Sequence, residues 1–427
     1  MNREDLEQVL ADQRKELLGR DRSMFVRRAE EEQINLNSPH AQVVIGVRRS
    51  GKSTLCQAAV LQSGRPFGYV NFDDERLASL RGEDLNAVLE TLYALNGDFD
   101  VLFLDEVQNI PEWNLFVNRL LRQGMHVLVT GSNAKLLSSE LATHMVGRYD
   151  AVELFPLSFA EFCAFRGVDP ADKTTLAAGL RQRALDDYLR QGGFPELLTG
   201  DLSAPKYVST LVSDILERDI RQRLRQRSVR PIRIVADYLL SVVPTVLNSS
   251  ALGDRLELDR APNTVKTYVD HLRRAYLLVA IQKWSRKEHL RIRNEKLYPV
   301  DVALMGGGRQ ASPGENVGWR LETVVLIELL RRHHHLKDEV FYYQENRSEA
   351  DFVVCRGNET LAVVQVSAHL STPAVREREL RGAATAAKAT GCPEATLVTL
   401  HETGEDVVDG IRVRIVRARD WLCAPTL

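Results

Sequence analysis

The chain has 427 residues, and its 56 Lys and Arg against 58 Asp and Glu give a formal net charge of −2. This balance excludes a uniformly basic nucleic-acid coat, although a local basic patch remains compatible with it. Apolar residues make up 44% of the sequence, which is typical of soluble globular proteins. The length alone suggests about three domains.

The sequence gives little support for a membrane protein or an extracellular protein. No apolar run approaches the roughly 18 residues that span a bilayer. The N-terminal residues 1–6 are polar and contain no signal-peptide core. The five cysteines are scattered and form no CxxC pair. We therefore expect a cytoplasmic protein with no membrane partner, no disulfide framework and no zinc site.

The most informative motif is a glycine-bounded loop between a strand-like apolar run at 43–45 and a helix-like segment at 54–61. Backbone N–H groups of such a loop, and of the helix that follows, bind phosphate oxygens. Lys52 of this loop can reach the β- and γ-phosphates, and the Ser53 hydroxyl can hold Mg²⁺. The alternative is a glycine turn that carries a lysine by chance. The sequence predicts ATP and Mg²⁺ as ligands of the residues Gly46, Val47, Arg48, Arg49, Ser50, Gly51, Lys52, Ser53 and Thr54.

A second apolar run, at 101–104, ends in two carboxylates, Asp105 and Glu106. Such a run predicts a buried parallel strand, whose carboxyl end lies where open α/β sheets bind ligands. Asp105 would complete the Mg²⁺ shell next to Ser53, and Glu106 would orient or deprotonate the attacking water. The alternative is a solvated strand end. A strand near 67–72 and a helix near 84–95 come between the two motifs, an arrangement that resembles the hydrolytic, glutamate-bearing branch of ATPases with such a loop.

Two further candidates follow. The run 126–131 predicts another buried strand, after which Asn133, or Ser132 beside it, could hydrogen-bond the γ-phosphate or the water; the same residues also make a good turn. Arg148 could be a finger that reaches the γ-phosphate of a neighbouring subunit in a homo-oligomer. The alternative for Arg148 is an intramolecular salt bridge. Arg48 and Arg49 could instead contact phosphate or a partner.

These motifs resemble a large group of prokaryotic AAA-superfamily ATPases, in which a C-terminal domain of unknown function follows the ATPase core. The resemblance covers essentially the whole chain and implies an ATPase without supplying a substrate. The residues that carry it occur in this order: Gly46 to Thr54, Leu104-Asp105-Glu106, Thr130-Gly131-Ser132-Asn133, Gly147-Arg148-Tyr149, Pro156-Leu157-Ser158-Phe159 and Gly192-Gly193-Phe194-Pro195-Glu196.

The middle of the chain has a helical pattern from about 156 to 230, and the stretch 217–233 carries seven arginines. That charge run is either a solvated helix face or a nucleic-acid or partner contact. Three helical segments and two strand-like runs follow, which predicts a winged helix-turn-helix with Asn263 as the N-cap of its third helix. Such a domain can bind DNA, or serve as a lid or a protein contact. The candidate DNA-contacting residues are Asn263, Thr264, Lys266 and Thr267 on that helix and Arg291 and Arg293 on the wing.

The C-terminal segment resembles restriction-endonuclease-like nucleases in its order of helix, acidic strand and further strand. In that fold, one Glu and two acids hold Mg²⁺ and a lysine assists the water. Glu322 and Asp351 stand in the first two places, but Gln365 and Ser367 stand where Glu and Lys would be. We therefore expect the nuclease chemistry to be lost. Three consecutive histidines, 333–335, point in different directions on a helix and form no metal site.

The sequence thus predicts an α/β protein with a P-loop AAA-type parallel-sheet core at 1–155, a helical lid at 156–230, a winged helix-turn-helix at 231–310 and a nuclease-like α/β domain at 311–427. The expected activity is Mg²⁺-dependent ATP hydrolysis that drives a switch or motor, with double-stranded DNA or a protein as partner. Two alternatives stay open: a slowly hydrolysing regulatory switch that binds a protein, and an ATP-gated nuclease.

Overall fold

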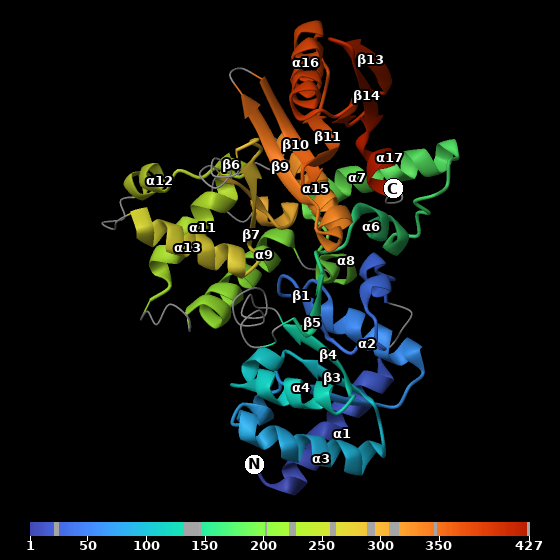
Figure 1. Ribbon diagram of the computed structural model, residues 1–427, viewed down its shortest axis with the longest axis vertical. Helices are drawn as coiled ribbons and strands as arrows, with labels where there is room; N and C mark the ends of the chain where they lie inside the picture. Colours follow the sequence, from blue (N-terminus) through green and yellow to red (C-terminus); the bar gives the residue numbers. More distant parts are fainter. Residues whose placement is uncertain are drawn as a thin grey trace. The chain divides into compact units, whose positions relative to one another are not determined.

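The computed structural model describes residues 1–20, 25–131, 145, 147–200, 203–221, 228–256, 262–287, 295–306, 316–345 and 348–424. The chain divides into two compact units (Figure 1). The first comprises Met1–Leu154 with Arg274–Tyr276, and the second comprises Phe155–Arg273 with Leu277–Leu427. Among the described residues, no helix is long and apolar enough to cross a membrane.

The first unit is built on a five-stranded parallel sheet with the order β2-β3-β4-β1-β5. The apolar runs that predict β1 and β3 are buried along their whole length, as expected for strands covered on both faces. This sheet confirms the predicted α/β core. The strands are β1 (Ala41–Ile45), β2 (Phe67–Asn71), β3 (Val101–Asp105), β4 (His126–Gly131) and β5 (Tyr149–Glu153).

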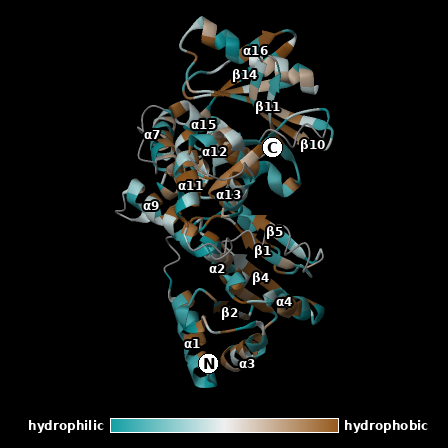
Figure 2. Ribbon diagram, turned by 90° about the vertical axis from the view of Figure 1, so that its left-hand side faces the viewer, coloured by the Kyte–Doolittle hydropathy of each residue, from teal (hydrophilic) through white to brown (hydrophobic). Residues whose placement is uncertain are grey.

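The helices of this unit bury apolar side chains against the sheet. In Figure 2, β1 and β4 show far more brown than α1, whose hydrophilic face is teal. Asn2 caps α1 by accepting a hydrogen bond from the Asp5 amide at 2.8 Å. The predicted strand and helix between the two nucleotide motifs are present as β2 and α3. The helices are α1 (Arg3–Gly19), α2 (Lys52–Ser63), α3 (Leu85–Asn96) and α4 (Trp113–Arg122).

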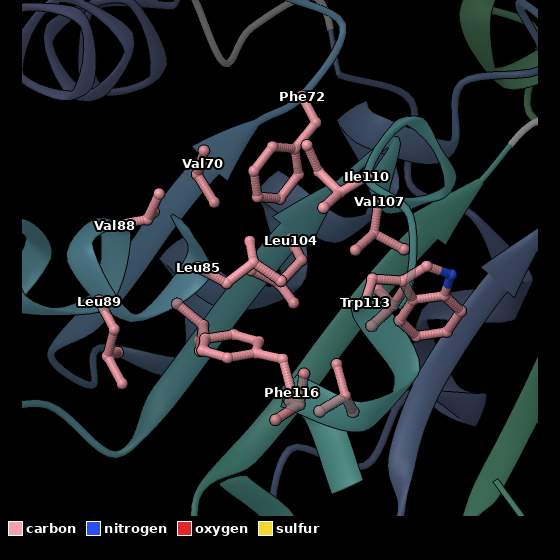
Figure 3. Packing of buried hydrophobic residues seen from close by; sticks show 14 of the residues in the cluster. Val70, Phe72, Leu85, Val88, Leu89, Leu104, Val107, Ile110, Trp113 and Phe116 are labelled. Atoms are coloured by element: carbon pink, nitrogen blue, oxygen red, sulfur yellow. The ribbon is translucent and has the colours of Figure 1, made fainter. Parts of the chain in front are cut away.

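Side chains from strands and helices interdigitate in the core of the first unit (Figure 3). Phe72 just beyond β2 and Leu104 of β3 pack in one cluster with Leu85 of α3 and with Trp113 and Phe116 of α4. Full burial of each such side chain stabilises the fold by about 1.5–3 kcal/mol. This packing fixes β3, and with it the two carboxylates at its end.

The second unit begins with helices, as the sequence predicts for 156–230. One prediction about them is wrong: α13 already begins at Pro262, so Asn263 lies in the first turn and is not the N-cap. Proline is favoured at the first helical position because its missing N–H has no partner there. The helices are α6 (Phe159–Phe165), α7 (Thr175–Gln191), α8 (Pro195–Thr199), α9 (Ala204–Asp214), a π-helix (Ile215–Ile220), α11 (Arg230–Val242), α12 (Ser249–Arg255) and α13 (Pro262–Arg274).

A nine-stranded mixed sheet runs through the described part of the second unit, in the order β13-β14-β12-β11-β10-β9-β7-β8-β6. Three helices accompany it: α15 (Val317–His333), α16 (Pro373–Thr390) and α17 (Ala418–Cys423). The strands are β6 (Thr245–Val246), β7 (Leu278–Lys283), β8 (Glu295–Pro299), β9 (Glu339–Glu345), β10 (Ser348–Arg356), β11 (Glu359–Ser367), β12 (Glu394–Thr399), β13 (Gly404–Val408) and β14 (Ile411–Arg417).

The hairpin predicted as a wing is part of this sheet. Strands β7 and β8 pair antiparallel, as the prediction requires. However, β7 also pairs in parallel with β9, with Gln282 opposite Phe341 and Lys283 opposite Tyr342. The sheet therefore continues across the boundary predicted at 310/311. The division of 156–427 into lid, winged helix and nuclease-like domain stays a prediction.

The turn Gly192-Gly193 has a structural role. Gly192 has φ +77°, and a Cβ there would lie 1.8 Å from Oδ1 of Asp301. The amide of Gly193 donates to Asp301 Oδ2 at 2.9 Å, and the amide of Ala303 donates to Oδ1 at 2.7 Å. Burial raises the pKa of Asp301 to about 6, although these two hydrogen bonds oppose the shift. The buried carboxyl thus joins two segments that are far apart in sequence.

Candidate nucleotide site

The predicted phosphate-binding loop connects β1 to α2 at the carboxyl edge of the parallel sheet. Gly46 has φ +152°, and a Cβ at this position would lie 2.1 Å from the Leu154 carbonyl oxygen. Gly51 precedes α2 with φ +98°. Both positions therefore require glycine, and the loop brings backbone amides to the N-terminus of α2, where a helix dipole favours anions.

Three polar side chains meet at the end of β3. The Ser53 hydroxyl donates to Asp105 Oδ1 at 2.8 Å. The Thr130 hydroxyl, on β4, donates to the same oxygen. Lys52 lies nearby in sequence and is only 4% exposed. Its Nζ donates to the carbonyls of Gly46 at 3.2 Å and Val47 at 3.0 Å. The geometry thus joins the two halves of the predicted site.

Burial controls the charge of Asp105. Its side chain is almost completely enclosed, and this burial raises its pKa to about 6. The Thr130 hydrogen bond lowers the pKa, the charge of Glu106 raises it, and Ser53 and Lys52 lower it. The protein therefore maintains a costly carboxylate at this position, which is typical of functional sites.

The oxygen donors fit a magnesium ion. A hydroxyl and a carboxylate oxygen face each other beside a phosphate-binding loop, and Mg²⁺ usually takes one or two carboxylates together with substrate phosphates and waters. Among the described residues, no three His, Cys, Asp or Glu side chains converge so that they could hold a metal ion by themselves. Ser53 and Asp105 are the residues that would hold the ion when nucleotide supplies the remaining oxygens.

Glu106 has an unusual backbone conformation, with φ +51°. Left-handed conformations are uncommon for residues other than glycine and concentrate at functional sites. The Glu106 amide donates to Thr130 Oγ1 at 3.0 Å, and the Gln108 side-chain amide donates to the Glu106 carboxylate. Thr130 and Gln108 thus orient the candidate base. Neither role was predicted from the sequence, although Thr130 lies near the end of a buried strand and Gln108 follows Glu106 by two residues.

Of the two other predicted site residues, the structure describes only Arg148. Asn133, with Ser132, lies outside the described residues. Arg148 is exposed, and its carbonyl accepts from the Ala41 amide at 3.0 Å. Because Ala41 begins β1 and the loop follows Ile45, Arg148 lies at the opposite edge of the sheet, roughly 16 Å away for five strand residues. An arginine side chain does not span that distance, which disfavours a role of Arg148 in its own chain's site.

Three arginines lie in the loop or contact it. Arg48 pairs with Asp73 at 3.4 Å, and Arg49 has φ +66°. The third, Arg28, was not predicted. It is buried, and its guanidinium donates to the Ser50 carbonyl at 3.1 Å. Arg28 therefore helps to hold the backbone of the loop in place. Because Arg28 precedes Ser50 by 22 residues, it is not part of any local motif.

The candidate DNA-contacting residues lie on α13. Asn263, Lys266 and Thr267 are exposed and Thr264 is half-buried, whereas Val265 and Tyr268 are buried. One face of the helix is thus covered and the other is open. Arg291 and Arg293 lie outside the described residues.

The raised pKa of Asp105 predicts how the stability of the fold depends on pH. Between about pH 4 and pH 6 the carboxyl is ionised in the unfolded chain but still protonated in the folded protein. The free energy of unfolding of the wild type therefore falls as the pH rises through this range, and it stays lower above pH 6. Asparagine has no such proton, and its Oδ1 can accept both hydroxyls. The unfolding free energy of nucleotide-free Asp105→Asn, relative to wild type, should therefore rise by about 2–3 kcal/mol from pH 4 to pH 8. Urea unfolding at both pH values measures this difference, and an unchanged difference would contradict the assignment.

Comparisons with known proteins agree with this geometry. Residues 38–163 match a family model described as an AAA domain, and residues 182–311 match a domain of unknown function (DUF8612). An uncharacterized protein of Haemophilus influenzae is 30% identical over 338 residues, which cover 75% of this chain and 81% of that protein. An uncharacterized protein of Methanocaldococcus jannaschii is 29% identical over 356 residues, with coverages of 82% and 79%.

Among solved structures, a Walker-type ATPase of Pyrococcus abyssi is 16% identical, with a TM-score of 0.44, and the match covers 67% of this chain and 96% of that one. The assignment rests on the sequence matches, because that structural likeness is too low to carry an argument. The chain belongs to the same family as the Haemophilus influenzae protein, and its residues 38–163 form an AAA domain of the P-loop ATPase type.

Proposed function

We propose that the protein hydrolyses ATP in a Mg²⁺-dependent reaction at the phosphate-binding loop. The observation that carries this proposal is the convergence of Ser53 and Thr130 on one oxygen of Asp105, directly before Glu106. A loop that only bound nucleotide would not need a second carboxylate held in a left-handed conformation. The AAA-domain match supports the same reaction class.

The residues divide the work as follows. The loop amides and Lys52 bind the phosphates, and Lys52 exchanges the carbonyls of Gly46 and Val47 for phosphate oxygens. Mg²⁺, when bound, neutralises charge on the β- and γ-phosphates. Glu106 orients the water and accepts its proton as the water attacks the γ-phosphorus in line with the leaving oxygen.

Arg148 is proposed to act in trans. Its distance from its own loop leaves a neighbouring subunit of a homo-oligomer as the site that it could reach. An arginine that neutralises transition-state charge in this way accelerates hydrolysis by roughly 10³–10⁵-fold.

A second candidate is a switch that hydrolyses ATP slowly until a partner binds. The hydrogen bond from Gln108 to Glu106 favours it, because a carboxylate engaged by an amide is a poorer acceptor for a water proton. The partner, either double-stranded DNA or a protein, would contact the exposed face of α13 through Asn263, Lys266 and Thr267.

The test is an assay of phosphate release from ATP, with and without double-stranded DNA, together with measurement of particle size in ATP. Wild-type protein should release phosphate only with Mg²⁺, and an excess of EDTA should stop it. No release with Mg²⁺, with or without DNA, would overturn the proposal. Stimulation by DNA that is lost in Lys266→Ala, but kept in the control Lys206→Ala on α9, would identify α13 as the contact.

A further inference from the structure

A cavity of about 800 Å³ opens in the second unit, next to the residues that resemble a nuclease site. Its walls come from β8, α15, β10, β11 and α16. Three of the four residues singled out for that resemblance, Glu322, Asp351 and Gln365, line it, and so does Lys296 of β8. Lys296 was not predicted to belong to this cluster, because it precedes Glu322 by 26 residues and lies on the strand assigned to the wing.

The ammonium group of Lys296 lies among three carboxylates. Its Nζ is 2.8 Å from Glu322 Oε1, 3.8 Å from Glu349 Oε1 and 3.9 Å from Asp351 Oδ1. The side chains of Lys296, Glu322 and Asp351 are only 11%, 13% and 10% exposed. This is the position in which a divalent cation would neutralise the same oxygens, since carboxylates are its preferred ligands.

Other groups of the protein also contact these carboxylates. The Tyr298 hydroxyl donates to Glu322 Oε1 at 2.6 Å, and the Val366 amide donates to Asp351 Oδ2 at 2.9 Å. The side-chain carbonyl of Gln365, which stands where the resembling fold has a Glu, accepts from the Asp351 amide at 3.1 Å. Its side-chain amide donates to Glu379 at 2.7 Å. Both ends of the Gln365 side-chain amide are therefore hydrogen-bonded to the protein, and the carbonyl end positions Asp351.

The charges favour a permanently protonated lysine. Burial by itself would lower the pKa of Lys296, but the charges of Glu322, Asp351 and Glu349 outweigh burial and raise it. Burial, and then the charge of Glu322, raise the pKa of Asp351, and Lys296 opposes both. Removal of Lys296 alone would leave carboxylates in a low-dielectric site without a counter-charge, which is strongly unfavourable unless a proton or another cation replaces it.

We propose that the ammonium of Lys296 takes the place of a divalent cation in this cluster and thereby excludes Mg²⁺ and Mn²⁺ from the cavity. The carboxylates of Glu322, Glu349 and Asp351 carry the negative charge that a cation would neutralise, and the ammonium of Lys296 already supplies the positive charge. The inference does not depend on the proposed ATP hydrolysis, since all of its residues belong to the second unit. With Lys296 in this position, metal-dependent nuclease chemistry would lack its cation, in addition to the Glu and Lys in whose places Gln365 and Ser367 stand.

The experiment counts bound Mn²⁺ by electron paramagnetic resonance on the full-length, nucleotide-free protein. Wild type should bind no ion through Asp351. Lys296→Met, which keeps most of the side-chain volume and removes the charge, should gain one site with an Mn²⁺ affinity at least about tenfold higher than wild type. Lys296→Arg keeps the charge and serves as the matched control, so it should behave as wild type. The added site should vanish in Lys296→Met/Asp351→Asn.

Two results would overturn the inference. One is a folded Lys296→Met protein that binds no more Mn²⁺ than wild type. The other is a wild-type protein that binds Mn²⁺ and loses that ion in Asp351→Asn. If Lys296→Met does not fold, the comparison of wild type with Asp351→Asn decides alone: equal Mn²⁺ binding supports the exclusion of metal, and a lost ion contradicts it.

Discussion

Glu106→Gln is expected to reduce ATP hydrolysis by a factor of roughly 10²–10⁴, the usual contribution of a positioned general base. Glutamine has nearly the same shape but cannot accept the proton of the attacking water. The Glu106 amide and its bond to Thr130 are unaffected by the change, so the strand end should keep its conformation. ATP should therefore still bind. Single-turnover phosphate release and equilibrium binding of ATP measure the two effects separately.

Glu112→Gln provides a matched control. Glu112 lies six residues further along, is exposed and also has a left-handed backbone, with φ +59°. The same chemical change there should leave hydrolysis within about twofold of wild type, as for a surface substitution away from the site. Full steady-state hydrolysis by the Glu106→Gln protein would contradict the assignment of Glu106 as base. Lost ATP binding in that variant would indicate a structural role for Glu106 instead.

The parts of the site that could be predicted are those that depend on residues close together in the sequence. The loop at 46–54 and the carboxylates after 101–104 follow from glycine spacing and from apolar runs, and both depend on neighbouring residues along the chain. Thr130 and Arg28 could not be assigned in this way. Thr130 acts because β4 lies beside β3 in the sheet, and Arg28 acts because it folds under the loop. Strand order and the fold of the preceding segment are not encoded in a local motif.

The second unit shows the same limit over longer distances. The pattern predicts β7 and β8 as a hairpin, because two apolar runs close together favour antiparallel pairing. It does not reveal that β7 also pairs with β9, about 60 residues later, because pairing of distant strands depends on tertiary packing. Lys296 illustrates the consequence. Once β8 joins the sheet, its lysine meets Glu322 and Asp351, and a residue assigned to a wing becomes part of the acidic cluster.

Lys52→Met is expected to weaken ATP binding by roughly 10- to 150-fold, which corresponds to the loss of one charge-assisted hydrogen bond of about 1.5–3 kcal/mol. Turnover should become undetectable, because the γ-phosphate loses a positive charge as negative charge moves in the transition state. Calorimetric titration with a non-hydrolysable ATP analogue and phosphate release measure the two effects. Lys15→Met, an exposed lysine on α1 of the same unit, is the control and should bind ATP as wild type does.

The folded state itself should tolerate Lys52→Met. In the nucleotide-free protein, Lys52 donates to the Gly46 and Val47 carbonyls, and methionine would fill most of its buried volume. Two carbonyls that lose a donor cost about 1–3 kcal/mol each when no water replaces it, but these face the phosphate-binding cradle, where water can enter. Unfolding free energy close to wild type, combined with lost turnover, assigns Lys52 to the reaction. ATP hydrolysis at the wild-type rate by a folded Lys52→Met protein would refute the loop as the catalytic site.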